Sequence, residues 1–478
     1  MSSAIVGTGI QTKGITANVL PSQGDFSPTN GQEALFLPHT GVEYPFLKKR
    51  PQFIREAAEF ELVHSGVGNM RFIGGTGSNS MQHSLAQRPT DFNSRLVYDC
   101  TFGIGHGAVG SLTSAGSQLL GNSNVVSGGT QINGQIINGR YFDKLSSYYN
   151  LKGSSDVTLL FESRFESGNL HRATQVGEFE YDLELKFDYG APAQQSQWFY
   201  FRVGNTRKNI VYKFNIVNLI KPDSLYNHGM KPLVYSKKEA DLKKNGWHRT
   251  GHEIKYYPSK KRSIASAQQF YTLSFSVEFT YDQDQVFFAH CYPYTYSDCI
   301  MFLKRVCLPA YGKDRLRRTA LCKTRAGNSC EMLIVTNFLS TQDQIADRKC
   351  VIISARVHPG ESNSSYIMEG IVELLLGDEK EAKQLRDIFV FKIIPMLNPD
   401  GVIVGNYRCS LAGLDLNRQY INPSIKAAPE IASMKEMVRK TLECRDIHLY
   451  VDIHGHSRHK NLFMYGCQHS GAAGGKQV

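Results

Sequence analysis

Three residues of this sequence have the types and spacing of an open metal site: His358, Glu361 and His454. His358 and Glu361 stand three positions apart after the apolar residues 351–353, and His454 ends a later apolar run. Two histidines and one carboxylate leave the fourth tetrahedral position of a zinc ion to water, which is typical of hydrolytic rather than structural zinc. A lone His-x-x-Glu is weak evidence, and His454 alone is more simply a histidine that ends a strand. The neighbouring sequence must therefore decide.

Both metal motifs follow predicted strands in a region where strands alternate with helices. Strands are expected at 333–337, 350–357, 389–396 and 447–453, and helices at 362–376 and 430–444. This order predicts an α/β domain with a largely buried, mainly parallel or mixed sheet and flanking helices. Ligands of open α/β sheets gather outside the carboxyl ends of the strands, which is where both motifs stand.

The region before this domain has a different composition. Aromatic and β-branched segments at 157–161, 179–187, 197–203, 211–217, 271–279 and 285–289 are separated by glycine, proline and asparagine. Closely spaced strands with such turn residues predict an antiparallel β-sandwich domain over residues 151–297. The α/β domain then occupies residues 298–478.

Residues 1–150 are predicted to be largely disordered. Residues 105–139 are rich in glycine, serine, asparagine and threonine, and such a composition buries too little apolar surface to offset the entropy of ordering. A weak helical period at 53–63 is the one ordered element expected there, and no function is assigned to this part.

Composition restricts the class of protein. The sequence contains no run of about 18 apolar residues, so no membrane span is predicted. The N-terminus does not have the pattern of a secretory signal. The ten cysteines are scattered without a Cys-x-x-Cys pair, which indicates reduced thiols in the cytosol. The net charge of +11 favours an acidic partner, but no motif supports nucleic-acid binding.

Two further segments lie between the metal motifs. Residues 398–408 begin with Asn-Pro-Asp-Gly and end at Arg408, and residues 413–420 contain Asp415, Asn417 and Arg418. Together with the metal motifs they resemble the zinc carboxypeptidases of the M14 type, and among these the cytosolic carboxypeptidases. The resemblance extends to residues 161–169, 197–201, 292–297, 454–458 and 463–467. Tyr420 is a small departure, since tryptophan is common there.

The resemblance implies a role for each of these residues. His358, Glu361 and His454 would bind Zn²⁺, and Asp415 would orient the first of the two histidines. The fold implied is the metallocarboxypeptidase-type mixed sheet.

Three other residues would act on the substrate. By resemblance, Asn417 and Arg418 would grip its terminal carboxylate, and Arg408 would be the catalytic residue that polarises the scissile carbonyl. The planar guanidinium suits such a carboxylate because it offers paired, charge-assisted hydrogen bonds.

The resemblance also implies a general-base glutamate on a strand beyond residue 478. Glu361 is expected to be a zinc ligand, Glu369 and Glu373 are expected on a helix, and residues 468–478 contain no acidic residue. A missing general base typically costs about 10²–10⁴ in rate. We therefore expect a C-terminally truncated carboxypeptidase domain that is inactive, or nearly so, on its own.

The implied substrates are acidic protein C-termini, with tubulin tails and glutamate foremost, in the cytoplasm at microtubules or cilia. Two alternatives stay open. The first is a non-catalytic short form that binds tubulin or another partner through the β-domain. The second is a zinc deacylase of small N-acyl amino acids, against which the large β-domain counts.

Overall fold

The computed structural model describes residues 92–100, 134–137, 140–143, 149–191, 195–262, 268–307, 314–456, 459 and 461–466. They form two compact units. The β unit holds the described residues up to 186 together with residues 199–290, and the α/β unit holds the described residues of 187–198 and from 291 onwards. Most of residues 1–150, including the expected helix at 53–63 and the glycine-rich segment up to residue 133, and all of 467–478 lie outside the described residues.

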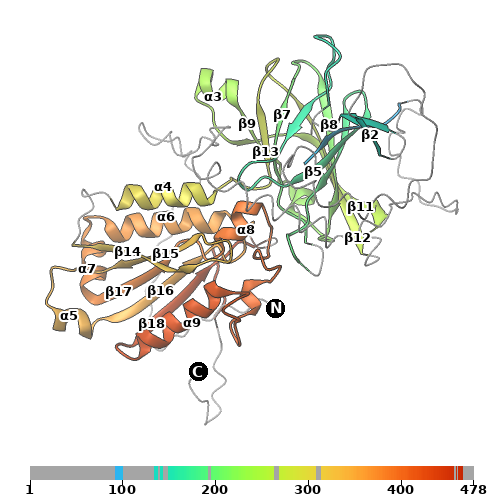
Figure 1. Ribbon diagram of the computed structural model, residues 1–478. Helices are drawn as coiled ribbons and strands as arrows, with labels where there is room; N and C mark the ends of the chain where they lie inside the picture. The colour runs from blue at the N-terminus through green and yellow to red at the C-terminus, as the bar shows by residue number, and fades with distance from the viewer. Residues whose placement is uncertain are drawn as a thin grey trace. The chain divides into compact units, whose positions relative to one another are not determined.

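The β unit contains two sheets (Figure 1). The six-stranded sheet runs in the order β1 (Arg95–Asp99), β5 (Leu170–Gly177), β6 (Glu180–Leu185), β8 (Val211–Leu219), β12 (Gln269–Glu278) and β11 (His252–Arg262). The five-stranded sheet runs in the order β10 (His248–Arg249), β9 (Leu233–Ser236), β13 (Val286–Ala289), β7 (Tyr200–Gly204) and β4 (Leu160–Glu162). All neighbours are antiparallel except β6 and β8. The strand β1, which pairs with β5, was not expected from the sequence.

Smaller elements complete this part of the chain. They are the hairpin of β2 (Gly134–Ile137) and β3 (Arg140–Asp143), the 3₁₀ turn η2 (Leu225–His228) and the helix α3 (Lys237–Lys243).

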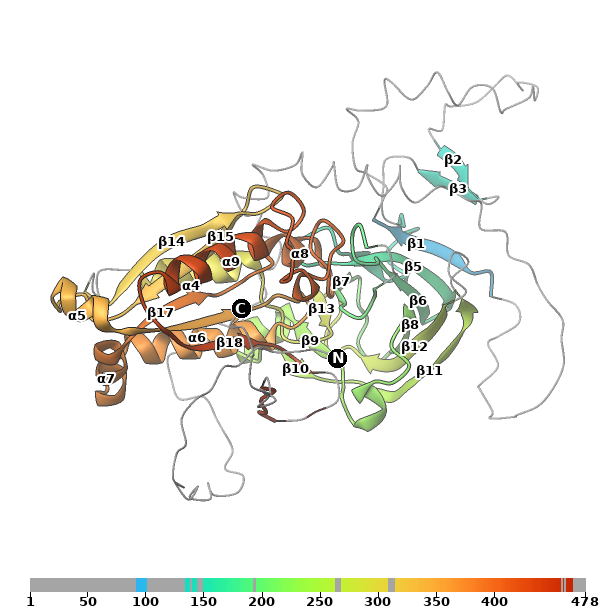
Figure 2. The ribbon, with the colours of Figure 1, turned by 90° about the horizontal axis from the view of Figure 1, so that it is seen from below.

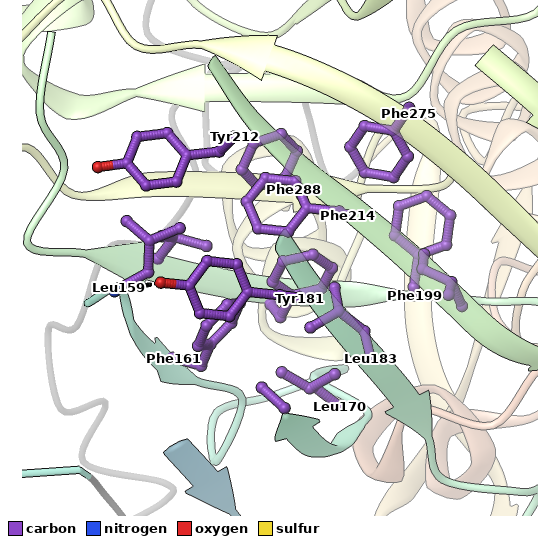
Figure 3. Close-up of a cluster of buried hydrophobic side chains, with 14 of the residues drawn as sticks. Leu159, Phe161, Leu170, Tyr181, Leu183, Phe199, Tyr212, Phe214, Phe275 and Phe288 are labelled. Carbon is purple, nitrogen blue, oxygen red and sulfur yellow. Dashed lines mark hydrogen bonds between the residues drawn. The ribbon is translucent and has the colours of Figure 1, made fainter. Parts of the chain in front are cut away.

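Aromatic side chains from both sheets fill the core of the β unit, as Figure 3 shows. Phe161 of β4 lies 5.3 Å from Tyr181 of β6, and Phe214 of β8 lies 5.4 Å from Phe288 of β13, between ring centroids. Because each pair joins one sheet to the other, the two sheets pack face to face. The predicted β-sandwich is confirmed, and its stability comes from burying large rings.

The α/β unit is built on one five-stranded mixed sheet. Its order is β14 (Leu316–Lys323), β15 (Ser329–Val335), β17 (Phe389–Ile394), β16 (Lys349–Ala355) and β18 (Ile447–Ile453). β14, β15 and β17 are antiparallel neighbours, whereas β17, β16 and β18 are parallel. The predicted mixed sheet with flanking helices is confirmed, and β14 is an addition to the strands expected from the sequence.

Helices cover both faces of this sheet, as Figures 1 and 2 show. α4 (Tyr296–Val306) and α6 (Asn363–Leu376) pack on one face, and α9 (Pro429–Leu442) packs on the other. The short helices are α5 (Gln342–Asp347), α7 (Lys380–Ile388), α8 (Pro399–Val404) and the 3₁₀ turn η4 (Leu416–Arg418).

The central strand β16 shows why a nearly continuous apolar run was expected to be buried. Val351 and Ile353 belong to the core under α4 and α6, whereas Cys350 and Ile352 belong to the core under α9. A strand that is buried on both faces has no polar side, so its sequence does not alternate.

None of the helices within the described ranges is both long and apolar enough to cross a bilayer.

Candidate metal centre and substrate site

Parallel pairing of β16 and β18 brings the two metal motifs together. Ala355 at the end of β16 is the register partner of Ile453 at the end of β18. His358 follows three residues after the first of these positions and His454 one residue after the second. The two imidazole rings lie 5.0 Å apart between centroids. Histidines far apart in the chain therefore meet at the carboxyl edge of the sheet.

The carboxylate of Glu361 lies between these histidines. Its Oε1 is 2.9 Å from His358 Nδ1 and its Oε2 is 3.1 Å from His454 Nδ1. One potential ligand atom from each of the three residues lies within 4.8 Å of the others. The predicted triad is thus brought to one point, with the Nδ1 edge of both rings turned toward the carboxylate.

Each histidine has a second carboxylate at its other ring nitrogen. Asp415 Oδ1 is 3.2 Å from His358 Nε2, and Asp452 Oδ2 is 2.8 Å from His454 Nε2. A carboxylate at Nε2 favours a proton on that atom and leaves Nδ1 with its lone pair for a metal. Asp415 was expected from the sequence but Asp452 was not, although the position of Asp452 two residues before His454 on β18 was a usable signal.

These contacts shift the proton equilibria of the group. Burial alone would lower the pKa of His454, but its hydrogen bonds with Asp452 and Glu361 raise it to about 10. Burial would raise the pKa of Glu361, yet the two histidines hold it far below its usual range. Likewise, burial opposes ionisation of Asp415, but His358 and Arg408 lower its pKa to about 2. Three carboxylates, those of Glu361, Asp415 and Asp452, thus surround the two imidazoles and favour positive charge at this point.

The donor set fits zinc. Two imidazole nitrogens and one carboxylate are the ligands of open zinc sites, and the second carboxylates provide the outer hydrogen bonds that such histidines need. Asp99, Cys100 and His171 form another group of potential ligands. There, however, Asp99 Oδ2 accepts a 2.6 Å hydrogen bond from Arg172 Nε, so a guanidinium already neutralises the carboxylate.

The turn that carries His358 and Glu361 is held in place by a buried arginine. Arg356, just after β16, is 2% exposed and has a left-handed φ of 61°. Its guanidinium donates to the carbonyl oxygens of Pro359 and Tyr294 and to the hydroxyl of Ser365. These bonds tie the turn to the first helical turn of α6. Burial lowers the pKa of Arg356 to about 10, so it stays charged at neutral pH.

Two glycines permit the close packing of the ligand turns. A Cβ on Gly360 would lie 2.6 Å from the Tyr407 ring, and one on Gly455 would lie 2.6 Å from Asn363 Oδ1. The N–H of Gly455 also donates to Glu361 Oε2 at 2.8 Å. The residue after His454 thus helps to orient the carboxylate ligand, and side chains larger than hydrogen would displace both turns.

Asp415 connects the metal group to the predicted substrate residues. Its Oδ2 accepts a 2.7 Å hydrogen bond from Arg408 Nε, while its Oδ1 accepts one of 3.0 Å from the N–H of Asn417. The second bond caps the short turn η4, which carries Asn417 and Arg418. Arg418 is exposed, and its Nη1 donates to the Asn417 carbonyl at 3.1 Å. One carboxylate therefore orients His358, Arg408 and the η4 turn.

Sequence comparisons agree with this geometry. The profile of the zinc carboxypeptidase family matches residues 309–474, and that of the cytosolic carboxypeptidase N-terminal domain matches residues 161–290. The chain belongs to the zinc carboxypeptidase family. The resemblance seen in the motifs is thereby confirmed, and zinc is the metal of this family.

Among curated relatives, cytosolic carboxypeptidase 2 of Homo sapiens is 51% identical over 67% of this chain and 35% of its own length. Cytosolic carboxypeptidase 3 of Mus musculus is 48% identical over 66% of this chain and 31% of its own length. The chain thus spans about a third of the relatives that it matches. A solved structure of a putative carboxypeptidase A from Shewanella denitrificans aligns with 62% of this chain and 69% of its own, at 24% identity and a TM-score of 0.49.

Proposed function

We propose that the protein is a zinc-dependent carboxypeptidase that removes C-terminal amino acids, glutamate by preference, from acidic protein tails such as those of tubulin. The observation that carries the proposal is the link through Asp415, which joins a zinc-type triad to Arg408 and to the Asn417–Arg418 turn. A site for cutting the last peptide bond needs these two functions side by side.

The metal would be held by His358 Nδ1, His454 Nδ1 and the carboxylate of Glu361. Zinc bound there would supply Lewis acidity and a water whose pKa is lowered toward neutrality. The contribution of the chain itself is to fix both imidazoles through Asp415 and Asp452, so that neither ring has to reorient during turnover.

Arg408 would stabilise the negative charge that develops on the scissile carbonyl oxygen. Its Nε is engaged by Asp415, while its side chain is 25% exposed. The planar guanidinium has further N–H donors, and donors held in place before the reaction are the effective ones. Removal of a comparable donor typically costs about 10²–10³ in kcat.

Asn417 and Arg418 would recognise the free terminal carboxylate. Arg418 is solvent-exposed and lies on a turn whose first N–H groups are fixed by Asp415. A guanidinium can bind a carboxylate through two parallel hydrogen bonds. This recognition would restrict cleavage to the last residue of a chain.

The acidic character of the substrate is supported by the net charge of +11 and by the resemblance to the cytosolic carboxypeptidases. A cytoplasmic location, at microtubules or cilia, is proposed on the same resemblance and on the names of the relatives. The expectation that the 478-residue chain is inactive, or nearly so, on its own stays a prediction.

The test is residue release from synthetic peptides by the protein purified from its native cells, with a recombinant 478-residue chain assayed beside it. A peptide ending in three glutamates should lose them one at a time, a peptide ending in alanines should react more slowly, and the C-terminal amide of the first should not react. A zinc chelator should stop release and added zinc should restore it. Equal cleavage of the amide and the free acid would overturn carboxylate recognition. Zinc binding without any release would instead favour a partner-binding protein.

A further inference from the structure

A buried carboxylate outside the predicted site holds the loop that carries Arg408. Asp188 belongs to the α/β unit although it follows β6 in the chain. It is 6% exposed, and its oxygens accept hydrogen bonds from the N–H groups of Tyr407 at 2.6 Å, Arg408 at 2.7 Å and Cys409 at 2.7 Å. Three consecutive amides therefore converge on one side chain.

The three hydrogen bonds offset the free energy that burial of the Asp188 charge costs, and they fix the loop. Burying a carboxylate is unfavourable, and burial raises the pKa of Asp188 to about 6 against the pull of the three N–H donors. The group is still ionised at neutral pH, so the three hydrogen bonds are charge-assisted and short. Such bonds restrain backbone orientation more strongly than bonds to a neutral amide would.

The backbone on either side of Asp188 is also fitted closely to the same loop. The N–H of Tyr189 donates to Asn406 Oδ1 at 2.9 Å. Gly413 has a left-handed φ of 72°, and a Cβ placed there would lie 1.9 Å from the carbonyl oxygen of Gly190. The backbone next to Asp188 thus contacts the loop on both sides of residues 407–409, at Asn406 and at Gly413, in addition to the bonds of the Asp188 side chain.

The loop held by Asp188 touches both parts of the candidate site. The Tyr407 carbonyl accepts a 2.8 Å hydrogen bond from Gly360 N–H, which lies between the first two metal ligands. On the next residue, the Arg408 side chain donates to Asp415. A shift of the 407–409 backbone would therefore move the guanidinium away from its partner.

We propose that Asp188 is a positioning residue for Arg408: by fixing the backbone of residues 407–409, it holds the guanidinium where the substrate carbonyl is to bind. The proposal rests on the proposed function only in the role given to Arg408. It adds a residue that comes from the segment between β6 and β7 rather than from the carboxypeptidase motifs.

Hydrogen exchange of the purified protein tests the positioning itself, independently of any activity. In Asp188→Asn the side-chain amide offers a single acceptor oxygen to three N–H groups, and its NH₂ group, being a donor, cannot accept from them. The amides of residues 407–409 should therefore exchange faster than in the wild type. Asp284→Asn is the matched control, because Asp284 is a buried carboxylate of the β unit that accepts from the N–H groups of Lys238 and Gln285. Unchanged exchange at 407–409 in a folded Asp188→Asn protein would overturn the proposal.

Steady-state kinetics with the glutamate peptide then test the consequence. We expect Asp188→Asn to lower kcat by about 10–100-fold with KM little changed, since small displacements of a catalytic group cost this much. In an Arg408→Ala background the same substitution should have almost no further effect, because the group that it positions is gone. An equal loss in both backgrounds would mean a general structural role and would refute the proposal.

The two proposals fail in different ways. If Arg408→Ala leaves kcat unchanged, the role assigned to Arg408 is wrong, whatever exchange shows. If Arg408→Ala lowers kcat but Asp188→Asn does not, only the positioning proposal is wrong. Should Asp188→Asn not fold, Asp188→Glu takes its place in both measurements, since it keeps both acceptor oxygens but shifts them by one methylene.

Discussion

The two units use their buried side chains in opposite ways. In the β unit, rings such as Phe214 and Phe288 pack across the two sheets and carry no charge. At the carboxyl edge of β16 and β18, the α/β unit instead buries Arg356 and His358 and places the partly buried carboxylate of Glu361 beside them. Burying rings stabilises a fold, whereas burying charges costs free energy unless a partner compensates. The difference marks the edge of the α/β sheet as the location of the candidate site.

Loss of a metal ligand should give the largest effect. Glu361→Gln keeps the shape of the side chain but removes the negative charge that faces both His Nδ1 atoms. Zinc affinity should fall by well over about 100-fold, because changes to residues that merely orient ligands already cost about 10–100-fold. Zinc titration by competition with a chromogenic chelator measures this. Wild-type affinity in the variant would remove Glu361 from the site.

Truncation of an aromatic residue in the β unit should affect stability and leave the metal site alone. Phe214 is fully buried and contacts rings from both sheets, Phe275 of β12 and Phe288 of β13. Phe214→Ala should lower the free energy of unfolding by about 3–5 kcal/mol, as measured by urea denaturation. Zinc stoichiometry of the folded protein should stay at the wild-type value. Loss of zinc from the folded variant would break the contrast between the two units.

Asp415→Asn should weaken zinc binding less than Glu361→Gln does, but more than Phe214→Ala does. It removes the charge that fixes the His358 tautomer and the Arg408 side chain. We expect about 10–100-fold weaker zinc binding together with a lower kcat. Asp400→Asn is the control in the same unit, because that buried carboxylate accepts from Thr324, Ala326 and Asn328 instead. If both variants bind zinc equally well, the role of Asp415 is only structural.

The smallest expected effect is on the pH dependence of stability, and it concerns Glu430, a buried glutamate that has no proposed role in the candidate site. Its Oε2 accepts no hydrogen bond from the described residues, and burial raises its pKa to about 8. The folded protein therefore binds the proton more tightly than the unfolded chain, and the free energy of unfolding falls as pH rises from about 4.5 to 8. Glu430→Gln should remove up to about 1.4 kcal/mol of this loss per pH unit. Denaturation of both proteins at pH 6 and pH 8 would show it, and parallel pH profiles would contradict it.

Local sequence predicted the main elements of the α/β unit because its strands are short apolar runs between helical periods. β16, β18 and α9 lie within a few residues of their expected bounds. β14 was missed because Arg317, Arg318 and Lys323 give it the composition of a solvent-exposed edge. Charge, rather than hydrophobicity, is what protects an edge strand, and such strands look like loops.

The candidate site was predicted as far as motifs reach. The triad and Asp415 stood in recognisable patterns, and the structure brings them together. Asp188 could not be found in this way, because its partners are backbone amides more than 200 residues later in the chain. Backbone donors leave no trace in side-chain types, so such a contact becomes visible only in three dimensions.

The pairing of β16 with β18 links metal binding to folding. His358 and His454 are neighbours only while β18 is paired with β16. An ion that binds this arrangement but not the open chain stabilises it by mass action, by about 2.7 kcal/mol when free zinc is 100 times the Kd. Zinc would then link the two strands, and metal supply in the cell would set the fraction of the protein in which they are paired.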